Sequence, residues 1–244
     1  MRIISAAPSN TEILYRLGKE DEIVATTSLC DYPEEARMKD SIGGWSDDAD
    51  LEKVKEKDPD VVLTSDRLQE DFKDRLEDAG VKTVHLSPES LHEVYSSIER
   101  IGEEVGKHGK AKTIVENMKQ RIKKTDLCGK RIYCEEWSKP PMVSGNWIPD
   151  LIERCGGEYF PAEGRSRELT QAEIADFDPE IIVLNVCGAG EKADTETISG
   201  RDSWQEITAV ENDAVFVIDD SLLNRPGPRL AEGVERIEEL IQDV

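Results

Sequence analysis

Short apolar runs alternate along this chain with longer segments in which apolar residues recur every three or four positions. The short runs are rich in Ile and Val and predict buried strands, whereas the longer segments predict amphipathic helices. No hairpin signal separates consecutive strands, so we expect parallel sheets. The predicted strands cover residues 2–5, 22–27, 60–65, 82–86, 130–136, 180–186 and 214–219. The predicted helices cover residues 9–18, 50–58, 67–80, 90–106, 146–157, 172–178, 203–210 and 227–244.

The two halves of the chain repeat one arrangement. In residues 51–63 and again in residues 172–184, a predicted helix leads through Asp-Pro-acid into a strand, with Pro59 and Pro179 in corresponding places. The repetition predicts two Rossmann-like α/β lobes.

A helical segment separates the repeated halves. Residues 108–126 follow helical spacing, and a helix of roughly 16 residues would be about 24 Å long, enough to bridge two domains. We therefore expect an N-terminal lobe over residues 1–107, a connecting helix over 108–126 and a C-terminal lobe over 127–244. A stiff connector of this kind predicts a cleft of nearly fixed width between the lobes.

The composition is that of an acidic globular protein. Hydrophobic residues make up 37% of the chain and charged residues 34%, and the formal net charge is -22. So many negative charges exclude nucleic acid and anionic membrane surfaces as partners. No window approaches the roughly 18 apolar residues of a membrane span, so we expect no membrane insertion. We also expect a monomer.

Cysteine and histidine are too sparse to predict a metal site. The five cysteines show no CxxC or CxxH spacing, which favours buried thiols in a reducing compartment. His85 ends a predicted strand, but no second ligand lies near it in the pattern. The glycines match no nucleotide-binding fingerprint, and no nucleophilic elbow or HExxH motif is present, so we expect neither catalysis nor a required cofactor.

The first residues show no apolar signal-peptide core, no cleavage site and no lipid-accepting cysteine. As written, the sequence predicts a cytoplasmic protein. The alternative is an extracytoplasmic protein whose true start lies upstream.

Trp45 stands in a glycine loop, in the stretch IGGWSDDADLEKV. It either folds back onto its own lobe or presents its flat indole to a ligand, with Gly43 and Gly44 letting the backbone approach. Trp147, which opens a helix of the second lobe, has the same two interpretations. Tyr32 precedes a proline that favours extended backbone, and it is a further candidate for the cleft.

An ordered set of segments resembles the cobalamin-type substrate-binding proteins of ABC importers, which are class III, helical-backbone binding proteins. The resemblance extends from Arg2 to the last helix, and the class also includes siderophore and haem receptors. The segments that carry it are APSNTEIL, DYP, GGW, LEKVKEKDPDVVL, SGNWIPDLIERCGG, AEIADFDPEIIVL and NRPGPRLAEGVERI.

This resemblance implies a corrinoid held between the lobes without catalysis, with Trp45 against the corrin. Residues near the predicted first helix, where Ser9 or Asn10 is expected to be the cap, could also line the cleft. Arg225 could bond ligand oxygens, although pairing with local acids is an equal alternative. The predicted ligand-binding residues are Pro8, Ser9, Asn10, Tyr32, Gly44, Trp45, Trp147 and Arg225.

Two glutamates match those with which such proteins dock on an importer permease dimer. Glu52 follows Asp50, which is expected to cap a helix, and Glu173 fits a capping box with Thr170, so each also has a local structural explanation. The same resemblance leaves two alternatives to a corrinoid carrier. One is the binding of a ferric siderophore, haem or another metal chelate, and the other is a cytosolic corrinoid-handling factor or enzyme.

Overall fold

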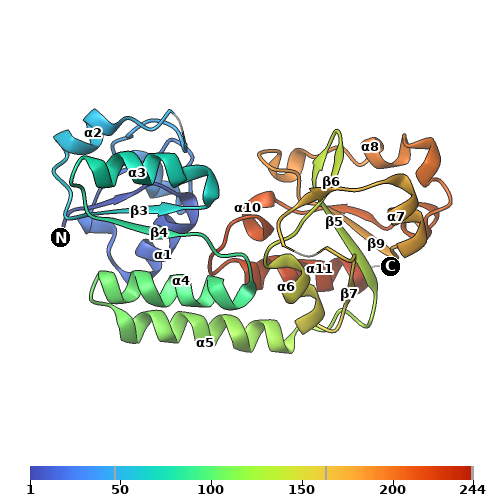
Figure 1. The fold of residues 1–244 in the computed structure, drawn as a ribbon. Helices are drawn as coiled ribbons and strands as arrows, with labels where there is room; N and C mark the ends of the chain where they lie inside the picture. The colour runs from blue at the N-terminus through green and yellow to red at the C-terminus, as the bar shows by residue number, and fades with distance from the viewer. Residues whose placement is uncertain (47, 163, 243–244) are drawn as a thin grey trace. The chain divides into compact units, whose positions relative to one another are not determined.

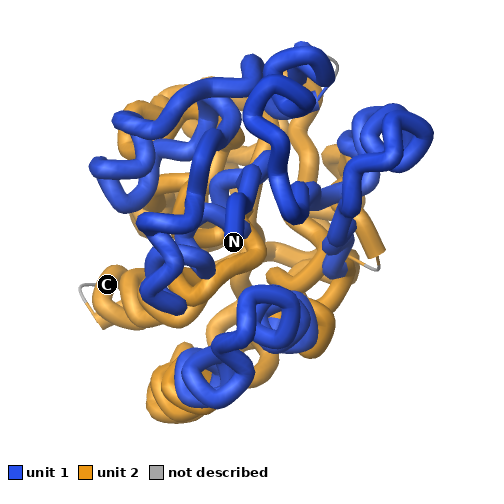
Figure 2. The backbone as a smooth tube through the Cα atoms, turned by 90° about the vertical axis from the view of Figure 1, so that its left-hand side faces the viewer, with its two compact units in different colours: residues 1–88, 95–115 blue, residues 89–94, 116–244 orange. Residues whose placement is uncertain are grey.

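The computed structural model describes residues 1–46, 48–162 and 164–242 (Figure 1). The chain divides into two compact units, coloured separately in Figure 2. Unit 1 comprises Met1–Pro88 and Tyr95–Val115, and unit 2 comprises Glu89–Val94 and Glu116–Val244. Each unit is an α/β structure built on its own sheet.

The sheet of unit 1 is parallel, as its buried apolar runs predict. Its strand order is β2-β1-β3-β4. Every residue of β1 and β3 is buried, which is typical of parallel strands covered on both faces. The four strands are β1 (Ile3–Ser5), β2 (Ile23–Thr26), β3 (Val61–Ser65) and β4 (Thr83–Leu86).

Helices α1 and α3 lie on opposite faces of this sheet (Figure 1). One core cluster joins Ile4 and Val62 of the sheet to Phe72 and Leu76 of α3. The helical segments of unit 1 before β4 are α1 (Pro8–Leu17), η1 (Glu20–Glu22), η2 (Glu34–Met38), α2 (Leu51–Glu56), η3 (Arg67–Gln69) and α3 (Glu70–Asp78).

Helices α4 (Leu91–Glu104) and α5 (His108–Lys124) each contain residues of both units. They run side by side (Figures 1 and 2), and a Cβ added at Gly102 of α4 would overlap Ala111 of α5. Glycine at this position therefore permits close packing of the two helices. Helix α5 is the long helix expected between the lobes.

The sheet of unit 2 is mixed. Its strand order is β10-β9-β5-β6-β8, and β7 pairs with β5. Strands β9, β10 and β7 run parallel to their partners, but β5 and β6 form an antiparallel pair. The expectation of purely parallel pairing was therefore wrong here. The strands are β5 (Arg131–Ser138), β6 (Pro141–Val143), β7 (Glu158–Tyr159), β8 (Arg167–Glu168), β9 (Ile181–Leu184) and β10 (Val215–Val217).

The helices of unit 2 are mostly short, apart from the closing helix α11. That helix buries one apolar stripe, which includes Leu230, Val234, Ile237 and Ile241. The helical segments are α6 (Ile148–Arg154), α7 (Gln171–Phe177), η4 (Gly190–Lys192), α8 (Glu196–Ser199), η5 (Asp202–Trp204), α9 (Thr208–Glu211), α10 (Asp220–Leu223) and α11 (Leu230–Gln242).

The repeated Asp-Pro-acid sequence forms the same contacts in both units. In unit 1 the backbone N–H of Arg2 donates to Asp60 Oδ2 at 2.6 Å, and its Nε donates to the Asp58 carbonyl at 3.1 Å. In unit 2 the N–H of Arg131 donates to Glu180 Oε2 at 3.2 Å, and its Nε donates to the Asp178 carbonyl at 2.7 Å. An arginine at the start of the first strand thus fastens each turn.

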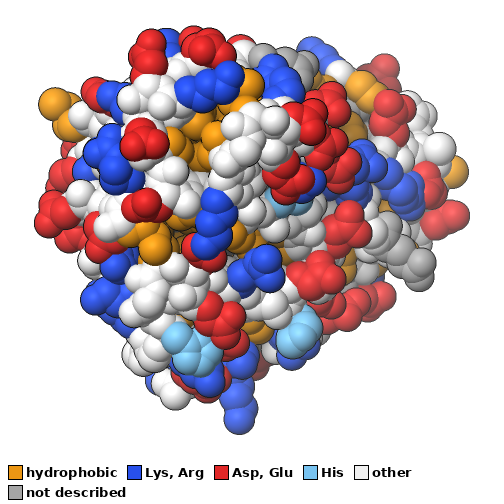
Figure 3. Space-filling model, turned by 60° about the vertical axis from the view of Figure 1, so that its left-hand side comes forward, with side chains coloured by type: hydrophobic (Ala, Val, Ile, Leu, Met, Phe, Trp, Pro, Cys, Tyr) orange, Lys and Arg blue, Asp and Glu red, His pale blue; other side chains and the backbone are white. Residues whose placement is uncertain are grey.

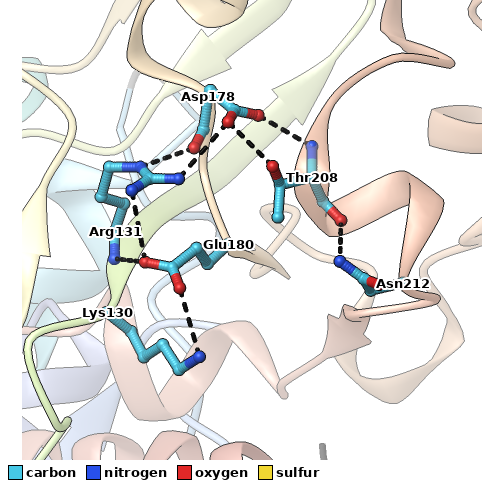
Figure 4. A network of polar contacts seen from close by, with 6 residues as sticks. All are labelled: Lys130, Arg131, Asp178, Glu180, Thr208 and Asn212. Atoms are coloured by element: carbon cyan, nitrogen blue, oxygen red, sulfur yellow. Dashed lines mark hydrogen bonds and ion pairs between the residues drawn. The ribbon is translucent and has the colours of Figure 1, made fainter.

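Unit 2 extends this arrangement to a further helix (Figure 4). The Asp178 carboxylate accepts hydrogen bonds from the N–H and the hydroxyl of Thr208, both at 2.8 Å, at the start of α9. Lys130 Nζ bonds the other oxygen of Glu180 at 3.2 Å. The turn before β9 therefore anchors both β5 and α9.

Most of the predicted helix ends are confirmed. Gly18 ends α1 at φ 72, Asp50 accepts N–H bonds at the start of α2, and Thr170 and Glu173 form a capping box. The expectation that Ser9 or Asn10 caps α1 was wrong. The cap position is Ala7, because Pro8, with its fixed φ and missing N–H, suits the first helical position.

Candidate ligand-binding site

The predicted residues of unit 1 gather at the carboxyl edge of its sheet. Strand β1 lies between β2 and β3, so the chain turns to opposite sides after β1 and after β2. Open α/β sheets bind ligands at such an edge, beyond the carboxyl ends of their strands. The segments that follow β1, β2 and β3 carry Asn10, Tyr32 and Gln69. Trp45 lies in the same segment as Tyr32, and its carbonyl bonds the Gln69 side chain.

The loop around Trp45 is closely held by its backbone. Gly43 accepts a bond from the N–H of Ser28 at 2.8 Å, and the N–H of Gly44 donates to Asp48 at 3.2 Å. Gly43 has φ 108, which favours glycine, and a Cβ at Gly44 would overlap the Asp48 carboxylate. The loop therefore requires glycine at position 43, and Gly44 leaves room for the Asp48 carboxylate.

Trp45 itself is half-buried. Its carbonyl accepts a hydrogen bond from the side-chain amide of Gln69. Its indole Nε1 is buried and has no hydrogen-bond partner among the described residues. A buried indole N–H usually finds a partner, so this donor is an unusual feature of the edge.

Exposed apolar side chains lie in the loops around Trp45. Leu29 and Tyr32, after β2, are 51% and 38% exposed, and Leu68, after β3, is 57% exposed. We call these three residues and Trp45 the apolar rim. Trp45 and Tyr32 are among the ligand-binding residues predicted from the sequence, whereas Leu29 and Leu68 are not. A single apolar residue in a loop is not part of any periodic pattern that would indicate its role.

The start of α1 contributes mainly buried groups. Ser9 and Asn10 are 4% and 2% exposed, and the Asn10 amide donates to the Thr64 carbonyl at 3.2 Å. Pro8 is half-buried. Asn10 therefore ties α1 to the carboxyl end of β3, and Pro8 is the more accessible of the three.

In unit 2, Trp147 is 6% exposed and its indole Nε1 donates to the Leu223 carbonyl at 2.8 Å. This environment matches the interpretation of Trp147 as an apolar plug at a helix start. Arg225 is half-buried and follows Asn224 directly.

Asn224 belongs to a partly buried polar group that the sequence did not indicate. Its amide donates to the Asn185 carbonyl at 2.8 Å and contacts Cys187 Sγ at 3.1 Å. The Asn185 amide donates to Ser144 Oγ at 3.0 Å. These bonds fix the turn before Arg225 against the carboxyl end of β9.

A buried ion pair also crosses unit 2. Glu135, at 0% exposure, accepts bonds from Arg201 at 2.7 and 3.0 Å and from the Tyr133 hydroxyl at 2.9 Å. The guanidinium carbon of Arg201 lies 4.2 Å from the ring centre of Trp204. The pair fastens the segment before Trp204 to β5, which is a structural role.

The two candidate docking glutamates differ in their surroundings. The side chain of Glu52 is 77% exposed and pairs only locally, with Lys55 at 2.8 Å. The Glu173 side chain is 38% exposed. Hydrogen bonds from the N–H and hydroxyl of Thr170, and then the pairing with Arg167 at 2.8 Å, lower the pKa of Glu173 to about 2.

The described residues offer no cluster of His, Cys, Asp and Glu that could hold a metal ion. Burial lowers the pKa of His85, whose Nδ1 lies 2.9 Å from the Thr64 hydroxyl. Burial raises the pKa of Cys134 and Cys155 to about 12, and that of Cys187 to about 11, so these thiols stay protonated near neutral pH.

On the face drawn in Figure 3, acidic and basic side chains intermingle, with apolar side chains in small groups between them. Within the described part of the chain, no helix has the length and apolar character needed to cross a bilayer.

Comparison with known proteins finds similarity over nearly the whole chain. The family model described as periplasmic binding protein matches residues 3–222. The uncharacterized ABC transporter substrate-binding lipoprotein YvrC of Bacillus subtilis (strain 168) is 33% identical over 98% of this chain and 79% of its own length. The vitamin B12-binding protein of Vibrio campbellii (strain ATCC BAA-1116) is 24% identical over 100% of this chain and 90% of its own.

A solved structure is similar in both fold and sequence. The possible iron-binding (periplasmic solute-binding) protein from Staphylococcus epidermidis ATCC 12228 aligns with a TM-score of 0.83 at 27% identity. The alignment covers 98% of each chain.

Proposed function

Because the chain belongs to the periplasmic binding protein family, whose members are non-catalytic substrate-binding components of ABC importers, we propose that its substrate is a corrinoid such as cobalamin. The observation that carries the proposal is the apolar rim around Trp45, held at the carboxyl edge of unit 1. A large flat ring with apolar faces is the ligand that such a surface suits, because an indole offers both contact area and a π-face.

The comparisons support this ligand class by analogy. A full-length relative carries the name vitamin B12-binding protein, and it aligns with this chain from end to end. In the proposal, Trp45 and Tyr32 contact the ring, and Gly44 and Pro8 let it approach the backbone. Arg225 bonds polar groups at the ring's periphery.

The remaining predicted residues have supporting parts in the proposal. Ser9 and Asn10 are buried and hold the start of α1 in place. Trp147 supports unit 2 through its bond to the Leu223 carbonyl.

A titration of the purified protein with cyanocobalamin, followed by tryptophan fluorescence, tests the proposal. We expect saturable quenching, and Trp45→Ala should weaken binding by about 2 kcal/mol, or about 30-fold in Kd. Trp137→Ala is the matched control, since Trp137 is 47% exposed on the β5–β6 hairpin and is not among the predicted ligand-binding residues. The absence of saturable binding would contradict a corrinoid.

A ferric siderophore, haem or another metal chelate is the second candidate ligand. It is favoured by the similarity to the Staphylococcus epidermidis protein titled possible iron-binding, at 27% identity. The same titration with haemin and with a ferric hydroxamate separates the two candidates. Tighter binding of either chelate than of cyanocobalamin would replace the corrinoid proposal. An enzyme that reuses the fold is set aside, because the family is non-catalytic.

The importer partner is a permease, and we propose Glu52 as the principal docking residue. The Glu52 side chain is 77% exposed and pairs with Lys55, whereas the less exposed carboxylate of Glu173 accepts bonds from Thr170 and Arg167. The names of the relatives favour the extracytoplasmic alternative over a cytoplasmic location. Cell fractionation tests that location, and recovery in the cytoplasm would contradict docking on an importer's outer face.

A further inference from the structure

We propose that Gln69 is the positioning residue for Trp45, setting the orientation of the indole in the apolar rim. The inference rests on the proposed function for its effect on ligand binding, but its structural part can be tested without a ligand. Gln69 occupies the N-cap position of α3, and the sequence pattern around it indicates no role in ligand binding.

The amide of Gln69 joins three separate segments at the carboxyl edge. Its Nε2 donates to the Ala6 carbonyl at 2.8 Å, just after β1, and to the carbonyl of Trp45. Its Oε1 accepts a bond from the N–H of Ser65 at 2.6 Å, at the end of β3. Because Gln69 is 0% exposed, these bonds are shielded from water.

A glutamine is required by this combination of partners. The two carbonyls need donors and the Ser65 N–H needs an acceptor, and a side-chain amide presents both on one planar group. An ionised glutamate has no donor, a methionine has neither function, and an asparagine is one methylene shorter. Replacement would leave buried backbone groups without partners, which is the costly way to lose a hydrogen bond.

Gln69 lies outside the loop of Trp45 but bonds it at Trp45 itself, so replacing Gln69 should affect Trp45 more than the rest of the loop. Backbone bonds of Gly43 and Gly44 hold the part of the loop before Trp45. The N–H of Asp50 donates to the Ile42 carbonyl at 2.7 Å and so closes the two ends of the loop. Among the described residues, it is Gln69 that bonds the tryptophan's own carbonyl. Removing this bond should free the indole while leaving the loop's flanks in place.

Fluorine NMR of the ligand-free protein tests the structural part. The chain has four tryptophans, so labelling with 5-fluorotryptophan should give four signals, of which Trp45→Phe identifies one. Gln69→Met should shift or broaden the Trp45 signal and leave the other three unchanged. Gln205→Met is the matched control, because the Gln205 amide also donates to two backbone carbonyls, in unit 2. This control should leave the Trp45 signal unchanged.

Gln69→Glu adds a rescue within one variant. At about pH 8 its carboxylate faces two carbonyl oxygens, and at about pH 5 the protonated group regains one donor, because burial raises the pKa of a carboxyl. The Trp45 signal should then return toward its wild-type position, which a general loss of stability would not produce. An unchanged Trp45 signal in Gln69→Met, or equal changes in all four signals, would overturn the proposal.

Binding of cyanocobalamin tests the functional part through a double-mutant cycle. Gln69→Met should raise Kd about tenfold in the wild-type chain and less than about twofold in Trp45→Ala, because contacting residues are not additive. Equal effects in both backgrounds would contradict action through Trp45. If cyanocobalamin does not bind at all, the proposed function fails, and the NMR result still decides the role of Gln69.

Discussion

Asp178 should contribute more to stability than Asp58, although both occupy the same place in the repeated turn. Both have positive φ, 45 and 43, and the carbonyl of each accepts a bond from an arginine of the first strand. Only Asp178 also uses its carboxylate, which bonds Thr208 twice at 2.8 Å and pairs with Arg131 at 3.4 Å. Asp58 makes no such carboxylate bond within the described residues.

The expected loss can be worked out from these contacts. Each bond to Thr208 contributes about 1 kcal/mol net. The ion pair with Arg131 adds only about 0.5 kcal/mol, because the Asp178 side chain is 41% exposed to solvent. Alanine at positive φ costs about 1 kcal/mol more in either variant. Asp178→Ala should therefore lower the free energy of unfolding by about 3 to 4 kcal/mol, and Asp58→Ala by about 1 kcal/mol.

Urea unfolding followed by far-ultraviolet circular dichroism measures both variants, because the helices and strands of both units contribute to that signal. Equal losses in the two variants would refute the assignment of stability to the Thr208 contacts.

The pH dependence of this difference follows from the pKa of Asp178. Burial raises the pKa of Asp178, but the hydrogen bonds from Thr208 and the charge of Arg131 outweigh it, and the net pKa is lowered. Because the pKa of Asp178 is lower in the folded than in the unfolded chain, its ionised carboxylate stabilises the fold above the unfolded pKa of about 3.9. This stabilisation is lost as pH falls through the lower, folded pKa. The difference between the two alanine variants should shrink below about pH 4.

Three further substitutions have defined outcomes. Gly44→Ala should weaken cyanocobalamin binding several-fold by calorimetry, because the new Cβ displaces the Asp48 carboxylate, and adding Asp48→Ala should restore binding; no rescue would contradict the clash. Glu173→Gln should lower the urea midpoint near neutral pH, and the difference from wild type should shrink as pH falls toward about 2, because the pKa of Glu173 is lowered to about 2; a difference independent of pH would contradict that. Arg201→Met should cost about 3 to 5 kcal/mol in urea unfolding, because Glu135 is left buried without its cation; a loss below about 1 kcal/mol would contradict that.

Local signals in the sequence predicted the local structure well. Asp50 and Thr170 precede their helices with the expected caps, and the glycine after α1 ends it in the left-handed region. The Asp-Pro-acid repeat correctly indicated two similar lobes. These features depend on residues that are close together in the sequence, so the sequence pattern alone predicts them.

Features that depend on distant partners could not be predicted in the same way. The bonds from Arg2 and Arg131 to their turns span more than 40 residues, and the β5–β6 hairpin has no glycine turn to announce it. In the sequence, Gln69 looks like an ordinary polar residue at a helix start. Its role depends on three segments that are distant in the sequence and come together only in the fold. The site residues from Pro8 to Arg225 stay predictions about ligand contact.

In the proposed function, the ring of Trp45 contacts a flat tetrapyrrole at the carboxyl edge of unit 1. A crystal structure of the protein with bound cyanocobalamin tests this most directly. We predict the corrin ring in van der Waals contact with the indole of Trp45, at about 3.5 to 4 Å between carbon atoms. A corrin bound away from Trp45, or crystals grown in excess cyanocobalamin that contain none, would contradict the account.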